Sequence, residues 1–124
     1  MDTPQKILII EDDRALQSAL VEMLSQEGYE TISAYDGQEG MEKAEVEKPN
    51  LILLDLILPK KDGYEVLAEI KKGSDKNIPV LILTNLEELD NVQRALDLGA
   101  KTFMVKSDFS LRDIIEKIKE NLQK

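Results

Sequence analysis

The stretch LILLDLILPKKDG, residues 51–63, raises the central question of this sequence. Four residues that open with Leu51 run directly into Asp55, and three more aliphatic residues follow before Pro59. A short continuous apolar run bounded by turn residues is typical of a strand buried on both faces of a parallel sheet. An ionised carboxylate at the end of such a strand is unstable unless a cation or hydrogen bonds compensate for the lost water. The groups that neutralise Asp55 therefore decide what this chain does.

The composition excludes several classes of chemistry. The chain has 124 residues, which suits one domain, 1–124, with one core. Hydrophobic residues make up 42% and charged residues 33%, as in ordinary globular proteins. There is no cysteine and no histidine, so disulfides, thiol nucleophiles, zinc sites built on these residues and histidine acid–base catalysis are all excluded.

The charge balance is acidic. Sixteen Lys and Arg stand against 25 Asp and Glu, for a formal net charge of −9. This argues against binding to nucleic-acid backbones or anionic membrane surfaces, since both attract cationic proteins. No apolar run approaches the ~20 residues of a membrane span, and the opening MDTPQK lacks the apolar core of a signal peptide. We therefore expect a soluble cytoplasmic domain that binds neither nucleic acid nor membranes.

Short apolar runs alternate with amphipathic segments along the chain. The predicted strands are 6–10, 31–34, 51–55, 80–84 and 102–106. The predicted helices are 14–27, 37–48, 63–72, 87–98 and 111–122. Asp13 is the expected N-cap of the first helix, and Ser110 with Asp113 resembles a capping box before the last. Five such β–α units predict an α/β, doubly wound, five-stranded parallel sheet with helices on both faces.

Polar residues stand at the carboxyl ends of the predicted strands. Glu11 and Asp12 follow the first strand, and Asp55, Thr84 and Lys106 end the third, fourth and fifth. Parallel strands all end at one edge of the sheet, where doubly wound folds bind their ligands. These side chains come from separate strands, so we expect them to converge.

The acids after the first strand narrow the class of ligand. Nucleotide-binding relatives of this architecture place Gly, Ser or Thr there to cradle phosphate, whereas IIEDDRA places carboxylates that repel anions. Hard oxygen ligands without His or Cys suit Mg²⁺, which in turn binds phosphate oxygens. An ionised Asp55 beside this ion and Lys106 is a competent nucleophile toward phosphorus, and the Thr84 hydroxyl is placed to bind a phosphoryl oxygen.

With these residues in place, the sequence resembles a receiver domain of the two-component response regulators, of the chemotaxis-regulator kind. The resemblance covers essentially the whole chain. It rests on the acidic pair Glu11 and Asp12, on Asp55, Thr84 and Lys106 after successive strands, and on the segment LPKKDG. It implies a flavodoxin-like strand order 2-1-3-4-5. It also implies a phosphorylation-controlled signalling switch rather than a turnover enzyme.

The resemblance assigns a role to each site residue. Asp55 is the phosphoacceptor for a phosphohistidine on a histidine kinase or histidine phosphotransfer protein. Asp12, Asp55 and the backbone carbonyl of Ile57 bind Mg²⁺ directly, and Glu11 acts through metal-bound water. Lys106 pairs with Asp55 and later with the phosphoryl group.

The resemblance also implies how the domain switches. Thr84 moves toward the phosphate, and Phe103 turns inward behind it. These movements change the face formed by the fourth helix, the fifth strand and the fifth helix, which an unidentified downstream protein reads. If the protein ends just after the predicted helix 111–122, we expect output through protein–protein contact; if the sequence is part of a longer chain, the remainder follows this helix.

Two departures from the family keep a second hypothesis open. The family usually places proline after its lysine, where this chain has Ser107, and a small residue after its threonine, where this chain has Asn85. A receiver fold that no longer switches and acts as an interaction module is therefore the alternative. A third hypothesis, an Mg²⁺-dependent phosphatase with an Asp nucleophile on the first strand, needs a D-x-D pattern, and Glu11 replaces its first residue.

Overall fold

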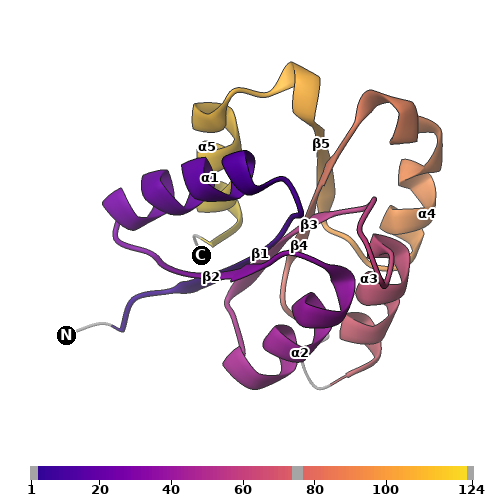
Figure 1. Ribbon diagram of the computed structural model, residues 1–124, viewed down its shortest axis with the longest axis horizontal. Coiled ribbons are helices and arrows are strands. Elements are labelled where there is room, and N and C mark those ends of the chain that lie inside the picture. Colours follow the sequence, from indigo (N-terminus) through magenta and orange to yellow (C-terminus); the bar gives the residue numbers. More distant parts are fainter. Residues whose placement is uncertain (1–2, 74–76, 123–124) are drawn as a thin grey trace.

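The computed structural model describes residues 3–73 and 77–122, and within them strands and helices alternate (Figure 1). The strands are β1 (Lys6–Ile10), β2 (Glu30–Ala34), β3 (Leu51–Asp55), β4 (Val80–Thr84) and β5 (Thr102–Val105). The α-helices are α1 (Arg14–Gln26), α2 (Gly37–Glu47), α3 (Gly63–Lys72), α4 (Val92–Asp97) and α5 (Leu111–Leu122). Two 3₁₀ helices, η1 (Leu86–Asn91) and η2 (Lys106–Asp108), precede α4 and α5.

The five strands form one parallel sheet in the order β2-β1-β3-β4-β5. This confirms the doubly wound, flavodoxin-like order expected for the chain. Strand order reverses at β1, whose neighbours are β2 on one side and β3 on the other. Because ligands of such sheets bind beyond the carboxyl ends of the strands at this reversal, the ends of β1 and β3 are where a site is expected.

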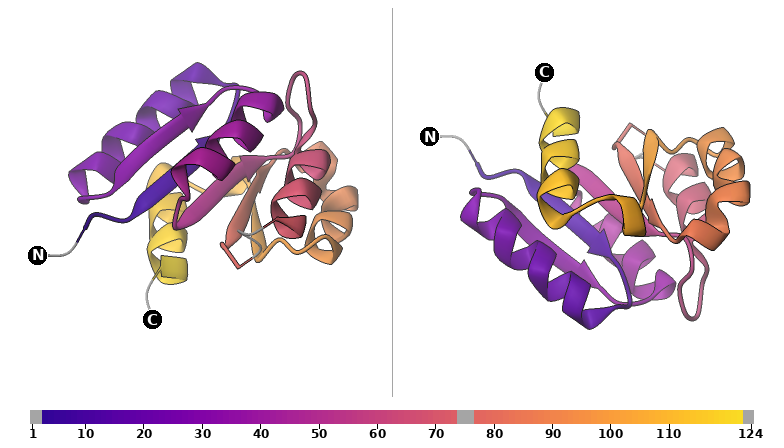
Figure 2. Two further views of the ribbon diagram at one scale, coloured as in Figure 1. Left: turned by 90° about the horizontal axis from the view of Figure 1, so that it is seen from below. Right: turned by 90° about the horizontal axis from the view of Figure 1, so that it is seen from above.

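Helices cover both faces of the sheet (Figures 1 and 2). Successive strand residues point to opposite faces, so Ile7 and Ile9 pack under α1 and α5, whereas Leu8 and Ile10 pack under α2, α3 and α4. Both faces are apolar because both are covered, which explains why β1, β3 and β4 read as continuous aliphatic runs. No helix in the described ranges has the length and apolar character needed to cross a membrane.

Helix starts follow the expected capping chemistry. The Asp13 carboxylate accepts a hydrogen bond from the Leu16 amide at 3.1 Å, as predicted for an N-cap. Ser110 and Asp113 form the predicted capping box, in which each side chain accepts from the other residue's backbone amide, at 3.1 Å and 3.0 Å. These bonds satisfy amides that have no partner within the helix.

The structure corrects two predicted elements. The single helix expected over 87–98 is instead η1 followed by the short α4. No residue of η1 is buried, so the apolar side chains of Leu86 and Leu89 do not pack on the core as those of a longer helix would. The last strand ends at Val105, and Lys106 opens η2. The Lys106–Ser107 peptide bond is trans, as are all peptide bonds of the described residues.

Candidate functional site

Three carboxylates from two strand ends form one cluster. Glu11 and Asp12 follow β1, Asp55 ends β3, and one oxygen from each carboxylate lies within 4.8 Å of the others. Glu11 and Asp55 are buried, whereas Asp12 is exposed. The acids that the sequence predicts to converge therefore lie together at the carboxyl edge of the sheet.

Asp55 is held by contacts to both of its oxygens. Its side chain is 3% exposed, Oδ1 accepts a hydrogen bond from the Ile57 amide at 3.2 Å, and Oδ2 accepts one from Lys106 Nζ at 3.3 Å. Burial raises the pKa of Asp55, and the charge of Lys106 opposes that rise. Lys106 is thus the side chain that pairs with the buried carboxylate at the end of β3.

Glu11 competes for the same cation. Its Oε1 lies 2.9 Å from Lys106 Nζ, and its Oε2 accepts a hydrogen bond from the Asp13 amide at 3.0 Å. Burial, followed by the negative charge of Asp55, raises the pKa of Glu11 to about 7. The sequence did not predict this Glu11–Lys106 ion pair, since it joins side chains from separate elements.

Lys106 is therefore shared by two buried acids. Burial alone lowers the pKa of this lysine, but its hydrogen bond to Glu11 and its attraction to both carboxylates outweigh burial and raise it. Three carboxylates face one ammonium, so the cluster has an excess of negative charge. Oxygen ligands grouped in this way, with surplus negative charge and one member open to solvent, fit a hard divalent cation such as Mg²⁺.

The two predicted switch residues occupy different environments. Thr84 at the end of β4 is fully buried, and its Oγ1 has no hydrogen-bond partner within residues 3–73 and 77–122. A buried hydroxyl without a partner is costly and calls for a functional explanation. Phe103 on β5 is partly buried and packs against the apolar cluster under α2, α3 and α4.

Gln17 on α1 supports the acidic segment, and the sequence analysis missed it. Its side chain is 1% exposed, and Nε2 lies within 3.1–3.2 Å of the carbonyls of Ile9, Glu11 and Ala34, to which it donates. The sequence signal was a polar residue on the apolar face of a helix, three positions before Leu20. A buried amide in that position holds the backbone from which the Glu11 carboxylate projects.

The loop after Asp55 packs against the start of α2. The Gly37 amide donates to the Pro59 carbonyl at 3.2 Å, and a Cβ at Gly37 would lie 1.7 Å from the Lys61 carbonyl oxygen. Lys60 in the same loop has φ +70° and pairs with Asp36 at 3.6 Å. Glycine at position 37 therefore lets the loop that carries Ile57 approach the helix.

With this geometry established, comparison with known proteins identifies the family. A family model described as the response regulator receiver domain matches residues 7–119. The chain belongs to this family. The receiver-domain resemblance found in the sequence is thereby confirmed, and with it the assignment to two-component signalling.

This receiver domain has relatives among transcriptional regulators. It is 41% identical over 116 residues to the transcriptional regulatory protein PdtaR of Mycobacterium tuberculosis, covering 93% of this chain and 55% of that protein. It is 38% identical over 120 residues to the alkaline phosphatase synthesis regulator PhoP of Bacillus subtilis, covering 97% of this chain and 49% of that protein. The chain thus spans about half the length of the curated relatives it matches.

Solved structures show the same receiver fold. A CheY-like receiver domain from Methanospirillum hungatei superimposes with a TM-score of 0.90 at 35% identity, covering 97% of this chain and 94% of that one. The receiver domain of the sensor histidine kinase PA1611 from Pseudomonas aeruginosa superimposes with a TM-score of 0.84 at 26% identity, covering 95% and 97%. The latter crystal structure has a magnesium ion coordinated in its active-site cleft.

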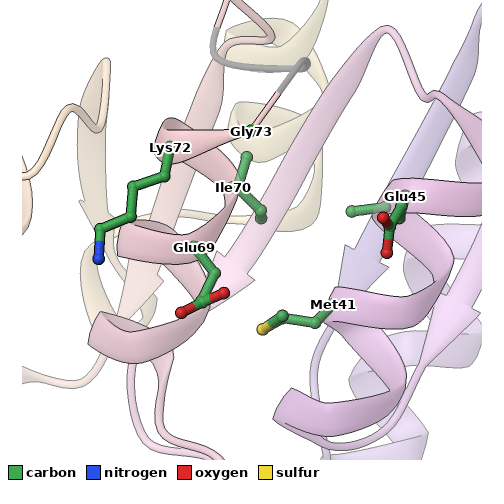
Figure 3. Close-up of a pocket in the computed structure, with 7 residues that line it drawn as sticks. Met41, Glu45, Glu69, Ile70, Lys72 and Gly73 are labelled. Carbon is green, nitrogen blue, oxygen red and sulfur yellow. The ribbon is translucent and has the colours of Figure 1, made fainter.

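A groove of about 260 Å³ between α2 and α3 lies apart from the acid cluster (Figure 3). Met41 from α2 and Glu69 from α3 point toward it from opposite walls, and Ile70 contributes to its lining. Its walls are the later turns of helices that begin at the carboxyl edge of the sheet. The groove therefore lies toward the opposite edge of the sheet from the acid cluster.

Proposed function

We propose that Asp55 accepts a phosphoryl group from a phosphohistidine on a histidine kinase or histidine phosphotransfer protein. The observation that carries this proposal is the buried Asp55 carboxylate, paired with Lys106 and crowded by two further acids. A structural ion pair at the end of a strand has no need for the two extra negative charges. A carboxylate that receives a phosphoryl group beside a divalent cation does.

The proposed transfer balances in atoms and charge. A carboxylate oxygen of Asp55 attacks the phosphorus, and the phosphorus–nitrogen bond to the partner's imidazole breaks. The nitrogen keeps the electron pair, and the imidazole, which carries a proton on its other ring nitrogen, leaves as a neutral group. Lys106 stabilises charge on the phosphoryl oxygens, and the unpartnered Thr84 hydroxyl donates a hydrogen bond to one of them. The product is an aspartyl phosphate that later hydrolyses.

The acid cluster suits Mg²⁺ as the cofactor of this transfer. Asp12 and Asp55 would bind the ion directly with the Ile57 carbonyl, and Glu11 would act through a bound water. When bound, the ion offsets negative charge on the transferring phosphoryl group. The exposure of Asp12 leaves the cluster open to solvent on one side, from which a phosphoryl donor can approach.

We propose that phosphorylation signals through the face formed by α4, β5 and α5. Thr84 leads directly into η1 and α4, and Phe103 lies on β5, so a change at either residue reaches this face. The downstream partner is expected to be a protein, because a chain with a net charge of −9 is poorly suited to nucleic-acid backbones.

The alternative of a non-switching interaction module rested on Ser107 and Asn85. Lys106 reaches both Glu11 and Asp55 through a trans bond to Ser107, so the missing proline does not remove the lysine from the cluster. Asn85 is partly buried at the start of η1 and makes no side-chain capping bond there. No contact of either residue favours the alternative over the switch.

Mass spectrometry of the intact protein tests the proposal. Incubation with Mg²⁺ and acetyl phosphate or phosphoramidate should add one phosphoryl group to the wild type and none to Asp55→Asn. Asp13→Asn is the matched control: it neutralises a neighbouring acid outside the cluster and keeps an N-cap side chain. Absence of both the adduct and Mg²⁺-dependent binding of beryllium fluoride by the folded wild type would refute the switch and favour the interaction module.

A further inference from the structure

Tyr64 joins helix α3 to the segment that follows Thr84. It is 6% exposed, and its hydroxyl donates a hydrogen bond to Glu88 Oε1 in η1 at 3.0 Å. The Arg94 guanidinium of α4 lies 4.1 Å from the centroid of its ring. One buried side chain therefore contacts both parts of the segment between β4 and the end of α4.

Within this segment η1 has few other anchors, whereas α4 buries Val92 and Ala95. No residue of η1 is buried, and Leu86 and Leu89 are 60% and 42% exposed. Within residues 3–73 and 77–122, the bond from Tyr64 to Glu88 is the one side-chain hydrogen bond that links η1 to another element. A 3₁₀ segment with little burial moves at low cost, so this bond has a large influence on where η1 lies.

We propose that Tyr64 is a positioning residue that holds η1 and α4 in the arrangement seen here and thereby opposes phosphoryl binding at Asp55. This inference rests on the proposed function, because it concerns the response of the same site. Tyr64 belongs to neither the acid cluster nor the pair of switch residues predicted from the sequence.

The connectivity of the chain explains why the Tyr64–Glu88 bond opposes phosphoryl binding at Asp55. Thr84 Oγ1 is buried without a partner among the described residues, and the proposed switch moves this residue toward the phosphoryl group. Only Asn85 separates Thr84 from η1, so such a movement displaces the start of η1 and strains the Tyr64–Glu88 bond. A contact present in one of two arrangements lowers the apparent affinity of any ligand that selects the other.

The protonation states of Tyr64 and Glu88 favour the hydrogen bond between them. Burial, followed by the hydrogen bond to Glu88, raises the pKa of Tyr64 to about 12, so the hydroxyl remains a donor throughout the physiological range. Asn91 Nδ2 donates to the same oxygen of Glu88 at 3.5 Å. The bond is thus between a protonated phenol and a carboxylate, which is stronger than one between neutral groups.

Binding of Mg²⁺ and beryllium fluoride, measured by isothermal titration calorimetry, tests the inference. Tyr64→Phe keeps the ring and removes the hydroxyl, and Glu88→Ala removes the acceptor. Each should bind beryllium fluoride at least about tenfold more tightly than the wild type, the change expected from the net contribution of one hydrogen bond to a charged group. The double variant should bind no more tightly than either single variant, because both substitutions remove the same bond.

Two controls separate positioning from general loss of structure. Glu88→Gln keeps an acceptor oxygen but loses the charge, so its affinity for beryllium fluoride should lie between those of the wild type and Glu88→Ala. Tyr29→Phe removes a hydroxyl that has no hydrogen-bond partner among the described residues and should change nothing. Unchanged or weaker binding by Tyr64→Phe, when the wild type binds, would overturn the inference and leave Tyr64 with a structural role. Absence of binding by the folded wild type would instead refute the proposed function, and this inference with it.

Discussion

Removing the metal should make the stability of this domain fall as pH rises from 5 to 8. Glu11 is 2% exposed and shares Lys106 with the equally buried Asp55, so one ammonium serves two carboxylates. Burial and the charge of Asp55 raise the pKa of Glu11 to about 7 in the folded protein, from 4.5 in the free side chain. The folded state therefore binds a proton that the unfolded chain has already released.

The sign and size of the effect follow from this difference in proton binding. The stabilisation is fully present below the pKa of the unfolded chain and is lost as pH rises through the folded pKa. A pKa difference of this size corresponds to a loss of about 3 kcal/mol in the free energy of unfolding. Asp36 and Glu39 have lowered pKa values and contribute the opposite slope, but they titrate below pH 5.

Urea unfolding followed by circular dichroism, with a chelator present, measures this slope. The free energy of unfolding of Glu11→Gln should fall less steeply with pH than that of the wild type between pH 5 and 8, since the amide keeps an acceptor for the Asp13 amide and carries no charge. The slope that remains comes from Asp55, whose pKa burial also raises. Glu22→Gln, the same substitution at an exposed position on α1, should keep the wild-type slope. Saturating Mg²⁺ should stabilise the wild type more at pH 8 than at pH 5, because the metal binds ionised carboxylates.

A free energy of unfolding that stays constant or rises from pH 5 to 8 in the metal-free wild type would refute this reasoning. So would a slope in Glu11→Gln equal to that of the wild type, since the titrating group would then lie elsewhere. The first result would mean that Lys106 neutralises both acids fully and that the cluster carries no excess charge.

Three further substitutions test how the rest of the fold supports the site. Gln17→Leu should lower the free energy of unfolding by about 1–3 kcal/mol and weaken Mg²⁺ binding measured by calorimetry, because three carbonyls each lose the hydrogen bond from the buried Gln17 amide. Gly37→Ala should lower the free energy of unfolding in urea by about 1–3 kcal/mol and weaken Mg²⁺ binding, because the new Cβ displaces the loop at Lys61. Gly73→Ala is its control: the new Cβ meets nothing closer than 3.8 Å, so the free energy of unfolding should stay within about 0.5 kcal/mol of the wild type. Ser110→Ala should lower the free energy of unfolding by about 1 kcal/mol without changing Mg²⁺ affinity, since it removes one side of the capping box.

Local sequence patterns predicted most of the fold. The apolar runs 6–10, 51–55 and 80–84 became strands with those bounds, because both faces of each strand are covered and the positions between the strand ends are apolar. The segment 87–98 was predicted less well. Its apolar residues recur at helical spacing, but its path depends on contacts with Tyr64 that no local pattern contains.

The sequence predicted which acidic residues form the candidate site, but it did not predict the contacts between their side chains and the rest of the protein. Glu11, Asp12 and Asp55 could be brought together from the sequence, because parallel strands end at one edge and strand ends can be counted along the chain. The sharing of Lys106 by two acids and the support from Gln17 were not visible, since each depends on side-chain directions across separate elements.

The sequence by itself determined the elements, their order and the residues at the ends of the strands. It did so because the spacing of apolar residues along the chain is a local property that records which face of each element is buried. Only the tertiary structure decided the charge balance at Asp55, the close approach of the Lys61 backbone to Gly37 and the hydrogen bond from Tyr64 to Glu88. These depend on distances of a few ångströms between residues far apart in the chain, which packing alone sets.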